Sequence, residues 1–240
     1  FSEAFAELPA DLVCCRHTLE HIGPVAEFVR TIHRTLARRT GTVVFFEVPD
    51  VLRILREGAF WDVSYERCSY FSHGSLARLF RECGFDLLDL YRDFDDRCLL
   101  LEARSHEDPT PRPILVEEDL EALRLAVEAF GAASTRRLER WTAFFVEAAL
   151  AGRRVALWES GSEGVSFLST LRLGPEVECV VDVNPYRQGK WMPGTGHPIV
   201  SPRSLLGLRP DAVLVMDPAQ LGETRKTLDD LGLRPQVLTP

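Results

Sequence analysis

The apolar positions of residues 1–105 alternate between strand-like and helix-like spacing. Uninterrupted apolar runs within 11–16 and 42–49 have the length of strands, and the second is rich in β-branched and aromatic residues. Between them, apolar residues recur every three or four positions over 24–39, which predicts a helix that Gly41 ends. The first half of this region therefore predicts a strand, a helix and a second strand.

The rest of this region predicts two helices and a hairpin. Helices are expected at 50–57 and from about residue 72 to Gly84, separated by an aromatic loop. Strands are expected at 85–94 and 98–105, with a tight turn of two aspartates between them. The order strand-helix-strand-helix-helix-strand-strand indicates an α/β domain.

The pattern changes after residue 105. Residues 105–113 have the composition of a linker, and apolar steps of three and four over 117–151 predict one long helix or two stacked ones. Beyond it, strand-like and helix-like patterns alternate, which is typical of a parallel sheet covered on both faces. The strands are expected at 153–158, 177–183, 197–200, 211–217 and 235–238. The predicted domains are therefore 1–105, a linker and helical spacer at 106–151, and 152–240.

Composition narrows the class of protein. Apolar residues make up 45% and charged residues 27% of the chain, as in a globular protein, and no apolar run has the length of a membrane span. The net charge of −8 argues against nucleic acid or an anionic membrane as partner. The six cysteines include no C-x-x-C pair, and their even number is compatible with disulfides. The chain is long and shows no signal peptide, so we expect reduced, mostly buried thiols in a cytoplasmic protein. The oligomeric state stays open.

Polar side chains follow the first predicted strand. His17, Glu20 and His21 come directly after it, at the edge where open α/β sheets bind ligands. Two other interpretations stay open: a helix start with polar surface residues, and a metal site, since H-x-x-E-H places these side chains on one helical face. The flanking sequence does not favour the metal, and we predict none.

Several runs together resemble a known family. They are R-H-x-L-E-H-I, a strand ending in E-V-P, W-D-x-x-Y-E-R-C-S-Y-F-S, G-S-L-A-R-L-F-R-x-C-G-F, and D-x-N-P-Y-R-Q-G-K-W-M-P-G-T at 182–195. The chain resembles class I S-adenosylmethionine-dependent methyltransferases, and among them the sugar C-methyltransferases with their C-terminal domain. The resemblance covers essentially all 240 residues.

The resemblance implies the fold class and the cofactor. It implies an α/β protein with the C-terminal half of a Rossmann-like methyltransferase sheet, a helical spacer and a second Rossmann-like domain. Relatives also carry an N-terminal zinc-binding domain and an acidic-Gly-x-Gly loop for the cofactor, and neither precedes Asp11. We therefore expect a family member without its N-terminal half, S-adenosyl-L-methionine as cofactor of the full-length protein, zinc only in that other domain, and weak cofactor binding by this chain alone.

The resemblance also implies site residues. Arg16, His17 and Leu19 would line the methionine side of the cofactor. The residues expected in catalysis are His21, Tyr65, Glu66 and Arg67. Arg67 stands where relatives carry a histidine and cannot act as a base, so His21, Glu66 or Tyr65 would remove the proton, and Arg67 would hold an enolate.

The C-terminal region has two candidate segments for the acceptor. The turn at 158–164 looks like a dinucleotide-binding turn, but Glu159 and Glu163 replace the usual glycine and lysine and disfavour phosphate. The run 182–195 is the stronger signature, and a purely structural loop is the alternative. The expected acceptor-binding residues are Tyr70, Gly161, Ser162, Asp182, Asn184, Lys190, Gly194 and Thr195.

The sequence therefore predicts a methyltransferase that methylates carbon in a small-molecule acceptor, such as a nucleotide-activated sugar. The alternative is a non-catalytic module of this family that binds a sugar nucleotide or a partner. An oxidoreductase that uses the C-terminal fold is weaker, because Glu159 replaces the first glycine of the dinucleotide fingerprint.

Overall fold

The structure is a computed structural model that describes residues 9–36, 39, 41–105 and 119–240. Nearly all of the predicted linker lies outside the described residues. The chain divides into two compact units. The first unit comprises the residues up to Arg56 and Tyr65–Phe130, and the second comprises Glu57–Ser64 and Gly131–Pro240.

The first unit has one mixed sheet, in the strand order β1-β2-β4-β3. Strands β1 and β2 are parallel, whereas β4 runs antiparallel to both β2 and β3. Its elements are β1 (Leu12–Arg16), η2 (Leu19–His21), α1 (Val25–Leu36), β2 (Val43–Pro49), α2 (Val51–Glu57), α3 (His73–Glu82), β3 (Phe85–Asp93) and β4 (Cys98–Ser105). The predicted order of elements is confirmed. The predicted tight turn has positive φ angles at Phe94, Asp95 and Asp96.

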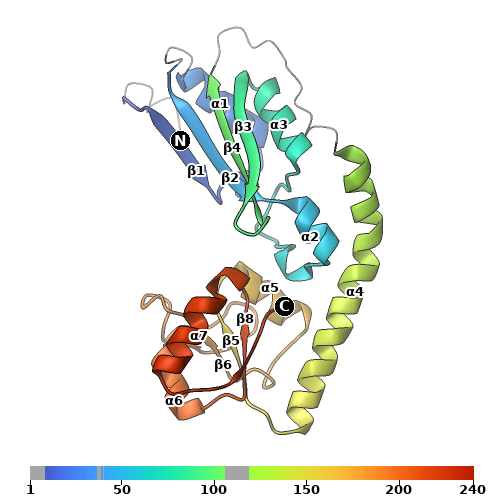
Figure 1. The fold of residues 1–240 in the computed structure, drawn as a ribbon, viewed down its shortest axis with the longest axis vertical. Helices are drawn as coiled ribbons and strands as arrows, with labels where there is room; N and C mark the ends of the chain where they lie inside the picture. Colours follow the sequence, from blue (N-terminus) through green and yellow to red (C-terminus); the bar gives the residue numbers. More distant parts are fainter. Residues whose placement is uncertain (1–8, 37–38, 40, 106–118) are drawn as a thin grey trace. The chain divides into compact units, whose positions relative to one another are not determined.

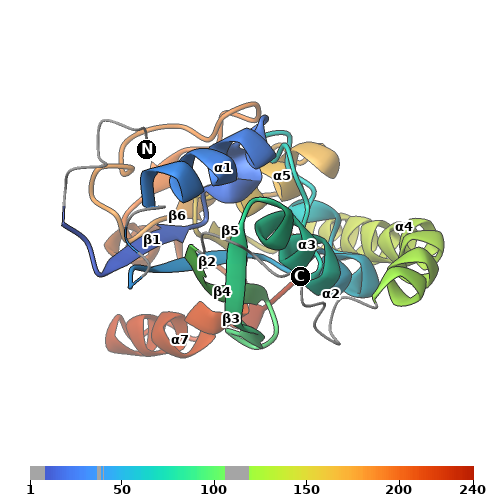
Figure 2. The same cartoon turned by 90° about the horizontal axis from the view of Figure 1, so that it is seen from above.

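Helices α1 and α3 cover the same face of this sheet (Figure 1), and Figure 2 shows both beside it from above. Their buried side chains join Val44, Phe46 and Val48 of β2 in one core. Phe80 of α3 packs edge-on against Phe46, with ring centroids 4.7 Å apart. A capping box at Ser72 explains why α3 begins where it does. The core thus fixes the strands whose ends carry the predicted site.

The second unit has a five-stranded parallel sheet, in the order β7-β6-β5-β8-β9. Its elements are η3 (Phe60–Asp62), β5 (Val155–Trp158), α5 (Ser162–Thr170), β6 (Cys179–Val181), β7 (Ile199–Val200), η5 (Pro202–Ser204), α6 (Leu205–Leu208), β8 (Ala212–Val215), η6 (Pro218–Gln220), α7 (Leu221–Asp230) and β9 (Gln236–Leu238). The α/β class is confirmed for both units. Helix α4 (Leu120–Leu150) is one continuous helix that begins in the first unit and ends in the second (Figure 1).

An aromatic cluster holds part of the second unit together. Phe167 of α5 is completely buried and contacts the rings of four other residues. Two of them, Trp141 and Phe145, come from α4, and the other two, Phe60 and Trp61, come from η3. A short segment from the first half of the sequence is therefore part of the second unit's packing.

The structure bears on two predictions made from composition, one about membrane spans and one about the cysteines. None of the helices in the described ranges is both long enough and apolar enough to cross a membrane. All six cysteines are free, as predicted from their spacing, and Cys83, Cys98 and Cys179 are buried.

Candidate functional site

The carboxyl ends of β1 and β2 meet in register and bring opposite charges together. Arg16 is the partner of Glu47 in the parallel ladder. Arg16 Nε lies 2.6 Å from Glu47 Oε2 and Nη2 lies 3.3 Å from Oε1. Only 2% of the Glu47 side chain is exposed. A buried carboxylate needs such partners, so Arg16 and Glu47 form the base of the site.

His17 turns back over this ion pair. Its φ of 45° is in the left-handed region, which is uncommon for a residue other than glycine. Its backbone N–H donates to Glu47 O over 3.0 Å, and its Nε2 lies 2.8 Å from Glu47 Oε1. Hydrogen bonds with Cys98 and Glu20 raise the pKa of His17 to about 10. His17 is therefore an imidazolium ion at neutral pH.

Glu20 is the second buried carboxylate of the site. Its side chain is 3% exposed, and Oε1 lies 3.6 Å from His17 Nδ1 and 3.9 Å from His21 Nε2. Burial disfavours the charged form and is the largest single effect, but the hydrogen bond from His17, a backbone hydrogen bond and the charges of His17 and His21 together lower the pKa of Glu20. Its Oε2 is buried without a hydrogen-bond partner among the described residues. This atom is free to accept from a ligand.

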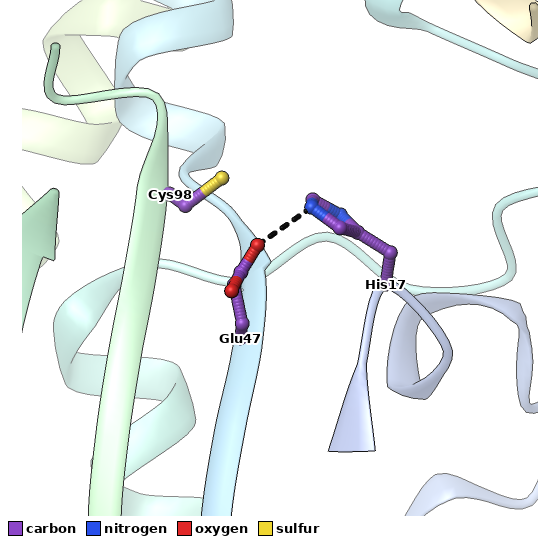
Figure 3. Close-up of side chains that lie close together, drawn as sticks. All are labelled: His17, Glu47 and Cys98. Atoms are coloured by element: carbon purple, nitrogen blue, oxygen red, sulfur yellow. Dashed lines mark ion pairs between the residues drawn. The ribbon is translucent and has the colours of Figure 1, made fainter. Parts of the chain in front are cut away.

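His17, Glu47 and Cys98 have ligand atoms of types that bind zinc. One atom of each lies within 4.8 Å of the others, and His17 and Cys98 point toward the Glu47 carboxylate (Figure 3). The positive charges of Arg16 and His17 already balance the negative charges of Glu20 and Glu47. The geometry is that of a charge-balanced ion-pair network, and nothing else in the described residues points to a metal ion here.

The tautomer of His21 follows from its hydrogen bond. His21 Nδ1 lies 2.8 Å from the backbone oxygen of Glu66, which can only accept. The proton of a neutral His21 is therefore on Nδ1, and the lone pair is on Nε2. The side chain is 39% exposed, so Nε2 can be reached from solvent. This arrangement equips His21 to take up a proton.

The loop Tyr65–Ser69 is held against η2, where His21 lies. The backbone N–H groups of Cys68 and Ser69 both donate to Glu20 O, over 2.7 and 3.0 Å. Cys68 Sγ donates to His21 O over 3.5 Å. The 65–69 loop therefore brings the carbonyl of Glu66, rather than its carboxylate, to His21.

The other predicted residues of the first unit lie at different depths. Tyr65 is fully exposed, Tyr70 is 37% exposed, Glu66 is exposed and Arg67 is half-buried. Leu19 is completely buried, and its side chain belongs to the core of the first unit. The side chain of Leu19 is therefore not accessible to a cofactor in this structure.

In the second unit, the turn between β5 and α5 is tight. Glu159 has a φ of 91°, a conformation that favours glycine. A Cβ atom on Gly164 would lie 2.8 Å from Glu159 O and 3.1 Å from Leu157 Cδ2, so only glycine lets α5 approach β5 this closely. Gly161 is the N-cap of α5 and Ser162 is its exposed first residue.

Asp182 organises the loop that follows β6. Its carboxylate accepts from the hydroxyl and backbone N–H of Ser160, from the N–H of Asn184 over 2.8 Å, and from Arg187 over 3.3 Å. Asn184 Oδ1 in turn accepts from the N–H of Tyr186. The Asp182 carboxylate is thus occupied by the protein itself.

His197 fixes the other end of this loop. His197 Nε2 lies 2.8 Å from Gly174 O and must donate, so Nδ1 accepts from the Thr195 hydroxyl over 2.8 Å. Gly194 has a positive φ of 78° in the turn before it. Between these fixed ends Lys190 is exposed, and so are Tyr186 and Trp191, at 83% and 66%. Neither aromatic residue was predicted from the sequence.

Family models and a known relative match the sequence of this chain. A family model described as a methyltransferase domain matches residues 1–90, and one described as the C-methyltransferase C-terminal domain matches residues 114–229. The chain is 29% identical over 216 residues to the C-methyltransferase NovU of Streptomyces niveus. The aligned region covers 86% of this chain and 51% of NovU. The chain is therefore similar to methyltransferases in its first part and to the C-terminal domain of C-methyltransferases in its second part. It spans about half the length of this relative.

A solved structure was also matched. It is the crystal structure of N,N-8-amino-8-demethyl-D-riboflavin dimethyltransferase (RosA) from Streptomyces davawensis, with a TM-score of 0.34, 15% identity, and coverage of 42% of this chain and 32% of that chain. A TM-score this low carries no weight, so the methyltransferase assignment rests on the family models and on NovU.

The strain at Glu159 leads to a prediction about stability. We expect Glu159→Gly to raise the free energy of unfolding by about 1 kcal/mol, because relief of the unfavourable φ exceeds the entropy that glycine adds to the unfolded chain. Thermal unfolding measures it. The control is Glu163→Gly in the first turn of α5, where the same change should destabilise by about 1 kcal/mol. Destabilisation by both changes would contradict the prediction.

Asp182 leads to a prediction about acid sensitivity. Burial opposes its ionisation, but the hydrogen bonds from Ser160, Asn184 and Arg187 outweigh burial and lower its pKa below the usual 3.8. This contribution to stability is complete above the unfolded-state pKa and is lost as the pH falls through the lower folded-state pKa.

We therefore expect Asp182→Asn to destabilise the protein at pH 7 by about 1–2 kcal/mol and to remove part of the stability loss below about pH 4. Urea unfolding from pH 7 to pH 2 tests this. Asp230→Asn, an exposed aspartate at the end of α7, should leave the acid dependence unchanged. Parallel pH curves for wild type and Asp182→Asn would rule the explanation out.

Proposed function

We propose that this chain is part of an S-adenosylmethionine-dependent methyltransferase that methylates a carbon atom of a small acceptor, such as a nucleotide-activated sugar. The family models and the C-methyltransferase NovU support the reaction class. The observation that carries the proposal is the tautomer of His21, which leaves Nε2 ready to take up a proton. Methylation of carbon beside a ketone needs such a base, whereas Arg67 cannot supply one.

The residues at the carboxyl ends of β1 and β2 fit one end of the cofactor. S-adenosylmethionine supplies the methyl group when bound, and its methionine part has an ammonium and a carboxylate group. Glu20 Oε2 is a buried acceptor without a donor in the described part of the chain, which suits an ammonium group. Arg16 and His17 provide positive charge for the carboxylate.

His21 would then act as the general base. Its Nδ1–H bond to Glu66 O orients the ring, and Nε2 takes the proton from the acceptor carbon. The resulting imidazolium ion is stabilised by Glu20, whose Oε1 lies 3.9 Å from Nε2. Arg67, half-buried in the same loop, would stabilise the enolate oxygen.

The loop that follows β6 would bind a nucleotide through residues of the second unit alone. Tyr186 and Trp191 expose rings on which a base can stack, and Lys190 adds a positive charge beside them. Asp182 and Thr195 serve the loop by fixing its ends. The acidic turn at Glu159 and Glu163 is a poor phosphate site, so we place the diphosphate near Lys190 instead.

A non-catalytic binding module is the second candidate. Arg67 in place of the usual histidine favours it, as does the acidic turn before α5. Such a module would bind a sugar nucleotide without acting on it.

We further propose a cytoplasmic protein with neither nucleic acid nor membrane as partner, in keeping with its net charge of −8 and six free cysteines.

Exchange of hydrogen for deuterium at the acceptor distinguishes the two candidates. The protein is incubated in D₂O with a nucleotide-activated keto sugar, and the product is examined by proton NMR. We expect deuterium at the carbon beside the ketone, and no such exchange with His21→Gln. Binding of the nucleotide sugar without any exchange, with or without S-adenosylmethionine, would favour the binding module.

A further inference from the structure

The 65–69 loop is preceded by a segment that packs in the second unit. The chain leaves the first unit after Arg56, residues Glu57–Ser64 belong to the second unit, and the first unit resumes at Tyr65. The chain therefore passes between the units twice within this short stretch, in addition to its passage within α4. We call Glu57–Ser64 the inserted segment.

The start of the inserted segment lies directly on helix α4. Gly58 has a φ of 63°, and a Cβ atom there would lie 2.7 Å from the backbone carbon of Ala133. Arg137, one turn further along α4, donates from Nε to Glu57 O over 3.2 Å. No side chain fits between the segment and the helix at Gly58, so this contact depends on glycine.

The middle of the segment is buried against α5. Phe60 and Trp61 are 7% and 4% exposed. The ring of Phe60 stacks on Phe167 with centroids 5.7 Å apart, and Trp61 meets the same ring edge-on at 6.2 Å. Ser166 Oγ donates to Val63 O over 3.3 Å near the segment's end. Helices α4 and α5 thus hold the segment along its length.

The next residues are held in the first unit. Cys68 and Ser69 donate to Glu20 O, and Glu66 O accepts from His21. Only Tyr65–Arg67 lie between the inserted segment and Cys68, the first residue that donates to Glu20 O. The chain that orients His21 is therefore fixed at one end by the second unit and at the other by the first.

We propose that the second unit positions His21, by holding the inserted segment and thereby restricting the 65–69 loop. Gly58, Trp61 and Ser166 are positioning residues in this proposal, because they act on His21 only through the loop. The role of His21 as base rests on the proposed function, but the restriction of the loop does not. The loop can be measured without any substrate.

The expected size follows from chain entropy. With the inserted segment in place, three residues, Tyr65–Arg67, separate it from Cys68. Once the segment detaches from α4 and α5, the chain that must be closed before Cys68 extends from Glu57 to Arg67. Closing the longer loop costs more entropy, so the hydrogen bonds of Cys68 and Ser69 should open about five- to tenfold more often.

Gly58→Ala tests this, because it forces the segment off α4 without removing a core side chain. Gly152→Ala is the matched control: Gly152 has nearly the same φ, 62°, but nothing lies within 4 Å of an added Cβ. Amide hydrogen exchange of the 240-residue protein is measured for both. We expect the Cys68 and Ser69 amides to exchange about five- to tenfold faster in Gly58→Ala only, with the amides of Leu76–Phe80 in α3 unchanged in both variants.

A milder pair covers the case in which Gly58→Ala fails to fold. Ser166→Ala removes the hydrogen bond to Val63 O, and Ser169→Ala changes an exposed serine of the same helix. Faster exchange at Cys68 and Ser69 in Ser166→Ala alone supports the proposal. Unchanged exchange of these amides in the folded Gly58→Ala or Ser166→Ala protein overturns it. The role of His21 as base is tested separately, by the turnover of His21→Gln, so failure of the proposed function and failure of this proposal are told apart.

Discussion

Replacement of His21 by glutamine should lower methyl-transfer turnover by about 10²- to 10⁴-fold, the usual range for a general base. His21→Asn should have the same effect and is the better matched variant, because the asparagine amide nitrogen takes the place of Nδ1, which donates to Glu66 O over 2.8 Å, and an amide cannot take up a proton. The loop contact is therefore kept while the base is lost. Steady-state kinetics with S-adenosylmethionine and a nucleotide-activated keto sugar measure the effect.

Two further variants sharpen this test. His33→Gln in α1 changes a histidine outside the site, which packs edge-on against the Phe85 ring, and should retain turnover. Glu66→Gln keeps the backbone carbonyl that His21 uses, so it should retain most of the turnover if His21 is the base, whereas a loss of about tenfold or more would show that the Glu66 carboxylate takes part in catalysis. Turnover of His21→Gln within a factor of about three of wild type would exclude His21 as the base.

The largest effect on stability is expected for Phe167→Ala, which should cost about 3–5 kcal/mol. Phe167 is completely buried, and its ring meets Phe60, Trp61, Trp141 and Phe145 with centroids 5.6–6.3 Å apart. Its removal leaves a cavity between α4, α5 and η3. Chemical denaturation monitored by far-UV circular dichroism gives the change in the free energy of unfolding.

Phe144→Ala provides the comparison. Phe144 also lies on α4 beside Trp141, but it is half-buried and makes no ring contact with Phe167. Its loss should cost less than half as much, since part of its surface is already in water. Equal losses for the two variants would mean that Phe167 is not the centre of the cluster.

Local pattern predicted most of the fold. The strands were found because their apolar runs are short and continuous, and β5, β6 and β8 are buried as parallel strands are. The inserted segment was not found. Phe60 and Trp61 show in the sequence that the segment will be buried, but the choice of core depends on contacts with α4 and α5 more than seventy residues away.

The site was predictable where it follows a strand end. Arg16, His17 and His21 lie where the rule for open α/β sheets places ligand-binding residues. Glu47 was missed because it sits within an apolar run, and its role arises from the register that pairs it with Arg16. Cys98 was missed because it comes from a strand far along the chain.

The fate of individual polar groups was harder to predict. Asp182 was expected to contact the acceptor, whereas its carboxylate accepts from Ser160, Asn184 and Arg187. A sequence cannot show whether a carboxylate is satisfied by its own loop. Tyr186 and Trp191 were missed for the same reason, because their exposure depends on how that loop folds.

The most direct measurement of the central claim is the position of the transferred methyl group. The full-length protein that contains this chain is incubated with a nucleotide-activated keto sugar and with S-adenosylmethionine labelled with carbon-13 in its methyl group, and the product is examined by carbon-13 NMR. The account predicts a labelled methyl group bonded to the carbon beside the ketone, and none with His21→Gln. A labelled methyl group on oxygen or nitrogen, or the same carbon-bound product with His21→Gln, would contradict it.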